Sequence, residues 1–244
     1  MKLGLIETVR VERGKVVLLP LHYKRFKESS ELLGFRLELS QKDFEERALK
    51  EATNKGKATL VRFLLTEEGL TVSSRECIKR KEIKLFVDFK FKRSYSLASG
   101  VKTTFKVQES SLFLKRAKER GFDEGITFSQ EGFLSECCYS NIFFLKGRTL
   151  FTPSLKCGCL KGTRREFVIW LCKEMGMEVV EGFFTLKELL KADEVFITSA
   201  REDCCRVVQV GSYRLKEVKG KGLSERIREV IKWQEFKGQK APES

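Results

Sequence analysis

The segment Gly100-Val101-Lys102-Thr103-Thr104-Phe105-Lys106-Val107 lies where an irregular stretch of the chain ends and a helical pattern begins. A helix is expected from Thr104 to Arg120, with Gly121 at its end. Lys102 would then precede the helix N-terminus, where the positive end of the helix dipole disfavours an ammonium group. A lysine that loses its proton becomes a nucleophile. The segment therefore predicts a reactive amine, although most lysines among 48 basic residues carry only a surface charge.

The composition indicates a compact protein without a membrane span. The chain of 244 residues is long enough for one large domain or two small ones, and 41% hydrophobic residues can fill a core. Met1 to Arg13 alternates polar and apolar residues, which is not the pattern of a signal peptide. No apolar run approaches the roughly 18 residues that a membrane helix needs. We therefore expect a cytoplasmic protein.

The eight cysteines favour buried, reduced thiols over a metal site. They include the pairs Cys137-Cys138 and Cys204-Cys205, but no two have the CxxC spacing, and the chain contains one histidine, His22. A zinc site needs closely spaced Cys and His ligands. No metal is therefore expected.

The net charge of +14 allows two interpretations. It would suit a nucleic-acid-binding protein, which stays the remote alternative. Lys and Arg are interspersed with Glu, however, and no arginine-rich arm or interleaved aromatic motif stands out. We therefore expect no nucleic-acid partner, and a basic surface that attracts a small anionic substrate or a cofactor phosphate.

The pattern of elements predicts a mixed α+β and α/β fold in two domains. Strands expected at Leu3 to Val11, Lys57 to Thr66 and Glu82 to Phe91 alternate with short helices and form a small α+β domain over residues 1–95. Lys92 to Gly100 shows no clear periodicity and connects this domain to a larger C-terminal domain over residues 100–244.

Three further segments carry candidate site residues. Glu136 lies in Leu134-Ser-Glu-Cys-Cys-Tyr-Ser-Asn-Ile-Phe-Phe among small and apolar residues, where a carboxylate is costly unless it meets a cation. Gly162 and Thr163 open a helix whose first amides can hold a phosphate. Thr198 ends an expected strand that begins at Glu194, and Ser199 follows it. Taken singly, each has an ordinary structural explanation as a salt bridge, a helix cap or a turn.

In this order and at these separations, the segments resemble the fold-type IV pyridoxal-phosphate (PLP) enzymes, the superfamily of branched-chain aminotransferases and aminodeoxychorismate lyases, with a D-amino acid aminotransferase-like fold. The resemblance implies PLP as the cofactor and a homodimer. It implies that Lys102 bonds covalently to PLP and later moves a proton, and that Glu136 contacts the pyridine nitrogen. The other implied cofactor contacts are Arg25, Leu160, Gly162, Thr163, Thr198 and Ser199.

The resemblance places the substrate at Leu5-Ile-Glu-Thr-Val-Arg10. Thr8 matches a threonine of the lyases that branched-chain aminotransferases replace with glycine, which implies a second catalytic residue and favours a lyase. A strand threonine chosen for β-propensity is the ordinary explanation. The chain starts closer to this motif than its relatives do, and Phe63 to Gly69 lacks the arginine of their substrate-binding loop. An aminotransferase acting on branched-chain or D-amino acids is therefore the alternative.

Overall fold

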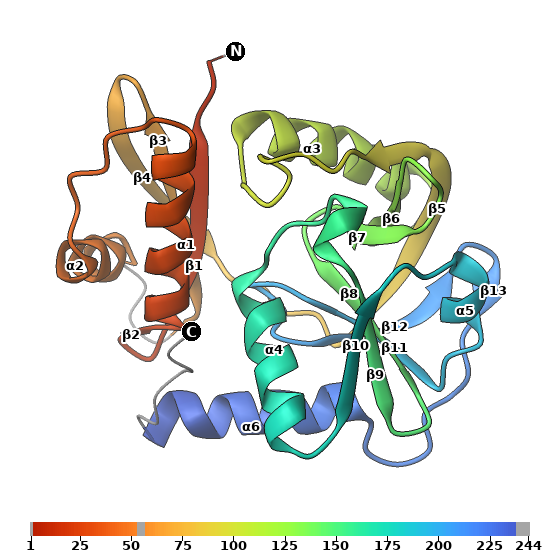
Figure 1. Ribbon diagram of the computed structural model, residues 1–244. Helices are drawn as coiled ribbons and strands as arrows, with labels where there is room; N and C mark the ends of the chain where they lie inside the picture. Colours follow the sequence, from red (N-terminus) through yellow and green to blue (C-terminus); the bar gives the residue numbers. More distant parts are fainter. Residues whose placement is uncertain (1, 53–56, 238–244) are drawn as a thin grey trace.

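The computed structural model of the chain describes residues 2–52 and 57–237, which form two β-sheets and the helices packed on them (Figure 1). One sheet has four strands in the order β2-β1-β3-β4. The other has nine described strands in the order β10-β9-β8-β11-β12-β5-β6-β7, with β13 beside β12. This architecture confirms the mixed α and β class that the sequence predicts.

The first sheet comes from the N-terminal part of the chain. Its elements are β1 (Leu5–Glu12), β2 (Lys15–Val16), β3 (Thr59–Thr66) and β4 (Gly69–Glu76), with α1 (Leu19–Leu32) and α2 (Gln41–Glu51) packed on it. Positive φ angles at Arg13 and Gly14 form the two-residue turn that joins β1 to β2. Phe26, Phe44 and Phe63 form the core of this unit, and the rings of Phe44 and Phe63 stack with centroids 4.1 Å apart.

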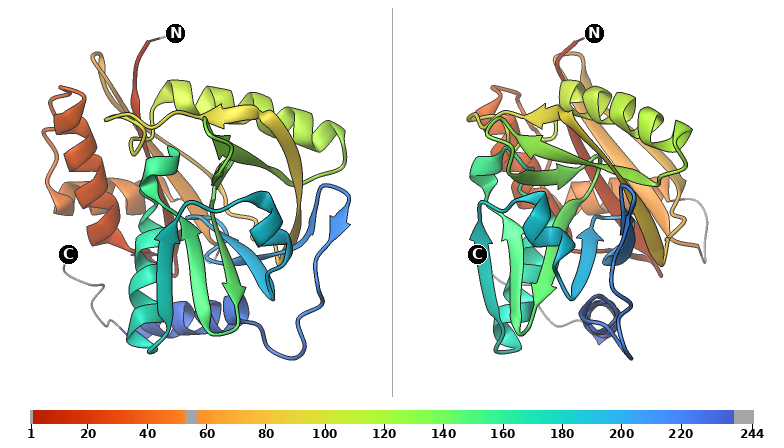
Figure 2. Two further views of the ribbon diagram at one scale, coloured as in Figure 1. Left: turned by 45° about the vertical axis from the view of Figure 1, so that its right-hand side comes forward. Right: turned by 90° about the vertical axis from the view of Figure 1, so that its right-hand side faces the viewer.

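The second sheet and its helices make up the rest of the described chain. Its strands are β5 (Glu82–Arg93), β6 (Glu124–Ser129), β7 (Leu134–Cys137), β8 (Asn141–Lys146), β9 (Thr149–Pro153), β10 (Glu178–Gly182), β11 (Glu194–Thr198), β12 (Cys205–Val210) and β13 (Tyr213–Arg214). The helices are α3 (Thr104–Glu119), α4 (Thr163–Glu174), α5 (Leu186–Leu190) and α6 (Leu223–Lys237), with a 3-10 turn at Leu155–Cys157. Figures 1 and 2 show α3 and α6 at opposite ends of the molecule. None of the described helices has the length and apolar character to cross a membrane.

The second sheet is buried on both faces at β8, where side chains of successive residues pack on opposite sides. Phe143 packs with Val168 of α4 and Ile227 of α6 on one face. Its neighbours Ile142 and Phe144 point to the opposite face and pack in a separate cluster that includes α5. Strands covered on both sides read as continuous apolar runs, which explains why the Asn-Ile-Phe-Phe-Leu run of β8 lacks polar alternation.

The sequence pattern groups Glu82 to Phe91 with the N-terminal α+β domain, but this strand does not pair with the described strands of that domain. β5 pairs in parallel with β12 and β6 and so lies inside the second sheet. Sequence order favoured the N-terminal grouping, but the partners of β5 come later in the chain and are brought to it by crossover connections. We propose that the two structural units divide between Glu76 and Glu82, before residue 95.

Candidate active site

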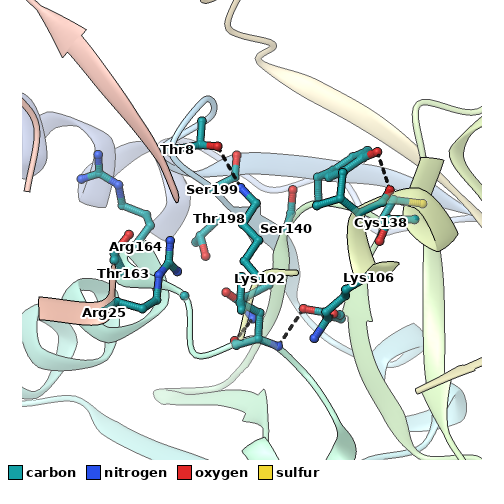
Figure 3. Close-up of a pocket in the computed structure, with 18 of the residues that line it drawn as sticks. Thr8, Arg25, Lys102, Lys106, Cys138, Ser140, Thr163, Arg164, Thr198 and Ser199 are labelled. Carbon is teal, nitrogen blue, oxygen red and sulfur yellow. Dashed lines mark hydrogen bonds and ion pairs between the residues drawn. The ribbon is translucent and has the colours of Figure 1, made fainter. Parts of the chain in front are cut away.

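A cavity with about 600 Å³ of empty space lies between the two units, and every candidate site residue from the sequence lines it. These residues are Thr8, Arg25, Lys102, Glu136, Leu160, Gly162, Thr163, Thr198 and Ser199. They come from β1, α1, the start of α3, β7, the start of α4 and the end of β11. Figure 3 shows the Lys102 side chain between Thr163 and Lys106. The fold therefore brings together six segments that are far apart in the sequence.

Backbone pairing between β1 and the start of α3 places Lys102 beside Thr8. The Lys102 carbonyl accepts a hydrogen bond of 2.8 Å from the Ile6 amide, and the Thr104 amide donates one of 2.9 Å to the Gly4 carbonyl. Lys102 Nζ then donates to Thr8 Oγ1 over 3.0 Å. The two side chains that the sequence suggests as catalytic are therefore in direct contact.

The surroundings of Lys102 favour its neutral amine. Burial lowers the pKa of Lys102 from 10.5 to about 8, and Arg25, Arg62 and Arg75 act in the same direction, while Glu7 opposes them. Cys138 also lines the cavity, but burial raises the pKa of its thiol to about 12. Lys102 is therefore the better nucleophile of the two at neutral pH.

One end of the cavity is suited to a phosphate. Gly162 is the N-cap of α4 and no side chain caps this helix, so its first amides have no acceptor within the helix. Thr198 Oγ1 is buried in the cavity wall without a hydrogen-bond partner in the described structure. A Cβ at Gly162 would lie 2.0 Å from Asn141 Oδ1, so only glycine fits where this loop passes Asn141. The Ser199 hydroxyl accepts a 3.2 Å bond from the Glu202 amide.

Arg25 reaches this end through a buried polar network. Its guanidinium donates to both oxygens of Glu7, at 2.9 and 2.5 Å, and to the Lys161 carbonyl at 3.1 Å. Glu7 also contacts His22 Nδ1 at 2.8 Å, and His22 Nε2 lies 3.2 Å from Thr163 Oγ1. The Arg25 and His22 partners hold the pKa of Glu7 far below its usual range despite the opposing effect of burial. That Arg25 contacts a phosphate stays a prediction.

At the other end, Glu136 is a buried carboxylate held by two ion pairs and one backbone amide. Its Oε1 lies 3.1 Å from Lys106 Nζ and 3.3 Å from Arg93 Nε, and its Oε2 accepts a 2.9 Å bond from the Leu160 amide. Asn141 Nδ2 donates to the Leu160 carbonyl over 2.9 Å, which fixes the same loop. Glu136 therefore meets the cations that the sequence argument required.

The sequence reading missed several residues of this site. Lys106 lies in the first turn of α3, four residues after Lys102, and its closeness in the chain to the candidate lysine could have revealed it. Arg93 and His22 carry no such signal, because their partners are set by sheet pairing and helix docking. Of the described residues, no group of His, Cys, Asp or Glu forms a possible metal site.

The donor set along the cavity fits PLP. A buried hydroxyl without a partner and an uncapped helix N-terminus suit the phosphate. An ordered carboxylate at the far end suits the ring nitrogen, and a lysine with a lowered pKa between them suits the aldehyde carbon. Each end of the cofactor thus has a chemically matching group.

Comparison with known proteins supports the same conclusion. Residues 4–210 match the model of the class IV amino-transferase family. The chain is 42% identical over 77 residues to an aminodeoxychorismate lyase of Bacillus subtilis, and 33% identical over 123 residues to the branched-chain-amino-acid aminotransferase of Escherichia coli. The first match covers 32% of this chain and 26% of the relative, and the second covers 50% and 40%.

Solved structures share the fold at lower identity. A protein described as a 4-amino-4-deoxychorismate lyase, from Legionella pneumophila, superposes with a TM-score of 0.84 at 21% identity over 94% of this chain and 90% of its own. The branched-chain amino acid aminotransferase of Escherichia coli superposes with a TM-score of 0.83 at 22% identity. The superposition covers 96% of this chain and 84% of the aminotransferase. The predicted fold is confirmed, and the family uses PLP as the sequence predicts. Since the family model spans most of its length, the chain belongs to the class IV aminotransferase family of PLP-dependent enzymes.

Proposed function

We propose that the chain is a 4-amino-4-deoxychorismate lyase, which releases pyruvate and leaves 4-aminobenzoate, a precursor in folate synthesis. The observation that carries this proposal is the 3.0 Å hydrogen bond between Lys102 Nζ and Thr8 Oγ1. A lyase of this type needs one group that removes a proton from carbon and one that returns a proton to the departing fragment. The two side chains in this contact would supply both groups at one place in the cavity.

PLP, when bound, supplies an aldehyde for the substrate amine and a ring that withdraws electrons from the neighbouring carbon. The N-terminus of α4, Thr198 and Ser199 would hold the phosphate, and Arg25 would add positive charge nearby. Glu136 would hold a proton on the ring nitrogen. Lys106 and Arg93 keep that carboxylate in place.

Lys102 would hold the aldehyde end of PLP and would act as the base toward the bound substrate. Its lowered pKa leaves a useful fraction of neutral amine at physiological pH. It would take the proton from the substrate carbon that bears nitrogen. Thr8 or Lys102 would deliver a proton to the methylene carbon of the leaving enolpyruvyl group, which becomes the methyl group of pyruvate. The Thr8 hydroxyl accepts a hydrogen bond from Lys102, and this contact would orient it for the transfer.

An aminotransferase is the second candidate, because the longer of the two sequence matches is to a branched-chain aminotransferase. It would use the same groups to hold the cofactor and would differ in where the proton is returned. We also propose that the chain forms a homodimer and that it acts in the cytoplasm. Light scattering of the purified protein would test whether it is a dimer.

The decisive experiment supplies purified, PLP-loaded protein with aminodeoxychorismate and no keto acid. The proposal expects 4-aminobenzoate and pyruvate in equal amounts. Lys102→Ala should abolish product and the visible band that borohydride otherwise reduces, whereas Lys118→Ala at the exposed end of α3 should leave both unchanged. A strict requirement for 2-oxoglutarate would show transamination instead.

A further inference from the structure

The one histidine of the chain, His22, lies buried in the cavity wall at the end suited to a phosphate. Its ring joins two side chains from other elements. His22 Nδ1 lies 2.8 Å from Glu7 Oε1 of β1, and His22 Nε2 lies 3.2 Å from Thr163 Oγ1 at the first residue of α4. All three residues are buried, so these contacts satisfy the ring nitrogens.

The charge of Glu7 fixes a proton on His22 Nδ1. The Glu7 carboxylate accepts hydrogen bonds from Arg25 and from the Thr8 amide, and its pKa lies far below the usual range. An ionised carboxylate can only accept hydrogen bonds, so His22 Nδ1 must donate to it. In the neutral ring, Nε2 then carries no proton and must accept a hydrogen bond from the Thr163 hydroxyl.

This arrangement directs the Thr163 hydrogen away from the cavity. A hydroxyl group has one hydrogen, and here it is donated to His22 Nε2. The Thr163 oxygen then presents only lone pairs to the cavity that it lines, where a phosphate oxygen would also present lone pairs. The neutral histidine ring therefore prevents the Thr163 hydroxyl from donating to a phosphate.

A proton on His22 Nε2 reverses the direction of this hydrogen bond. The charged ring donates from Nδ1 to Glu7 and from Nε2 to Thr163 Oγ1. The Thr163 hydrogen is then free to be donated to a phosphate oxygen. The two ligation states of the cavity end thus require two different protonation states of His22.

The charges around His22 are balanced so that an added anion can change its state. Burial lowers the pKa of His22 from 6.5, and Arg25 of α1 and Arg164 of α4 act in the same direction, while Glu7 of β1 opposes them. Lys102, at the start of α3, lines the same cavity and adds positive charge. A phosphate dianion at this end would add negative charge and favour the charged ring.

We propose that His22 is a positioning residue of the phosphate site, which takes up one proton from solvent when a phosphate group binds beside Thr163. The proton goes to His22 Nε2, and the Thr163 hydroxyl then donates to the phosphate. Occupation of the site is therefore linked to pH by a residue that acts through Thr163. The inference rests on the proposed function in one respect, because it assumes that the phosphate of PLP lies at this end of the cavity.

The test follows the single histidine by NMR in protein that contains isotope-labelled histidine. In the cofactor-free protein at pH 7, His22 should carry a proton on Nδ1 alone. In the PLP-loaded protein, the pH at which His22 titrates should be higher by at least about one unit. Pyridoxal is the matched control, because it has the ring and aldehyde of PLP but no phosphate, and visible absorbance shows that it is bound. It should leave the titration of His22 as in the cofactor-free protein. An equal shift with pyridoxal, or no shift with PLP, would overturn the inference.

Two variants test whether the Thr163 hydroxyl carries the link. Thr163→Ser retains a hydroxyl and should keep most of the shift, whereas Thr163→Val has a similar shape without one and should lose at least about half of it. An undiminished shift in Thr163→Val would overturn the inference, because the phosphate charge would then act on His22 directly. These measurements need no substrate. A phosphate-dependent shift of His22 without release of 4-aminobenzoate would reject the proposed reaction and keep the inference, and the reverse result would do the opposite.

Discussion

Lys102 Nζ and Thr8 Oγ1 lie 3.0 Å apart although 94 residues separate them in the chain. The contact depends on the short antiparallel bridge in which Leu5 faces Thr103, since this bridge fixes the start of α3 against β1. The proposed catalytic pair therefore lies at the junction of the two structural units. The energetic cost of burying Lys102 and the contacts of this site with the cofactor can be tested by separate variants.

Lys102→Met should stabilise the cofactor-free chain at pH 7. The folded pKa of about 8 lies below the ordinary 10.5, so below pH 8 the folded chain carries an ammonium that burial disfavours. The gain should be roughly 1–3 kcal/mol in urea unfolding, after discounting for partial exposure. Between pH 8 and 10.5 the folded parent has released a proton that the unfolded chain still binds. The parent therefore gains stability in this pH range, and the difference in unfolding free energy between Lys102→Met and the parent should disappear by about pH 10.5.

The pH dependence separates this effect from simple apolar packing. If Lys102→Met were more stable by the same amount at pH 7 and pH 10.5, the added methionine surface and not the lysine charge would explain the gain. Lys118→Met, at the exposed end of α3, should show no such pH-dependent difference.

Thr198→Val should weaken PLP binding without destabilising the cofactor-free chain. The Thr198 hydroxyl is buried and has no partner in the described structure, so its removal costs the apo protein nothing and can relieve an unpaired polar group. We expect the dissociation constant of PLP to rise about tenfold, as measured by a titration that records visible absorbance. Thr152→Val is the control, because the Thr152 hydroxyl donates a hydrogen bond of 2.9 Å to the Ile142 carbonyl. This variant should be less stable but should bind PLP as tightly as the parent. The opposite pattern would assign Thr198 a structural role.

Gly162→Ala should disturb both the loop and the cofactor site. The added methyl group would lie 2.0 Å from Asn141 Oδ1, so Asn141 must move and its bond to the Leu160 carbonyl must break. We expect a loss of about 1–3 kcal/mol in unfolding free energy together with weaker PLP binding. Gly100→Ala, where nothing lies within 4 Å of the added methyl group, should change neither quantity. Equal behaviour of the two variants would show that the loop adapts freely.

The sequence predicts which residues line this cavity better than it predicts the contacts between their side chains. Residues such as Gly162 and Thr198 stand at element ends, where local rules indicate helix caps and strand ends. The partners of Arg25 and Glu136 could not be predicted in this way. Glu7 and Lys106 reach them from other elements, and only the docking of α1 and α3 decides which of many charged residues meet.

The limits of the fold prediction have the same origin. Local patterns located the helix at Thr104–Glu119 and its N-cap region, because capping and periodicity act within a few residues. They did not place β5, whose partners β6 and β12 follow it in the chain, and they missed β7, β9 and β12. These three strands have four to six residues each, and β7 is buried along its whole length, so the chain offers little periodicity there.

Glu7→Gln should destabilise the chain by about 3–5 kcal/mol at pH 7, because it leaves the Arg25 guanidinium without its carboxylate in a largely buried site. The lowered pKa of Glu7 gives the parent stability that is complete above about pH 4.5 and falls as the pH drops below it, since the unfolded chain then binds the proton first. The deficit of the variant in urea unfolding should therefore shrink from pH 7 to pH 3. Glu68→Gln, at an exposed pair with Lys2, should leave stability unchanged. A deficit in Glu7→Gln that is constant with pH would mean that shape, and not charge, makes Glu7 essential to the network.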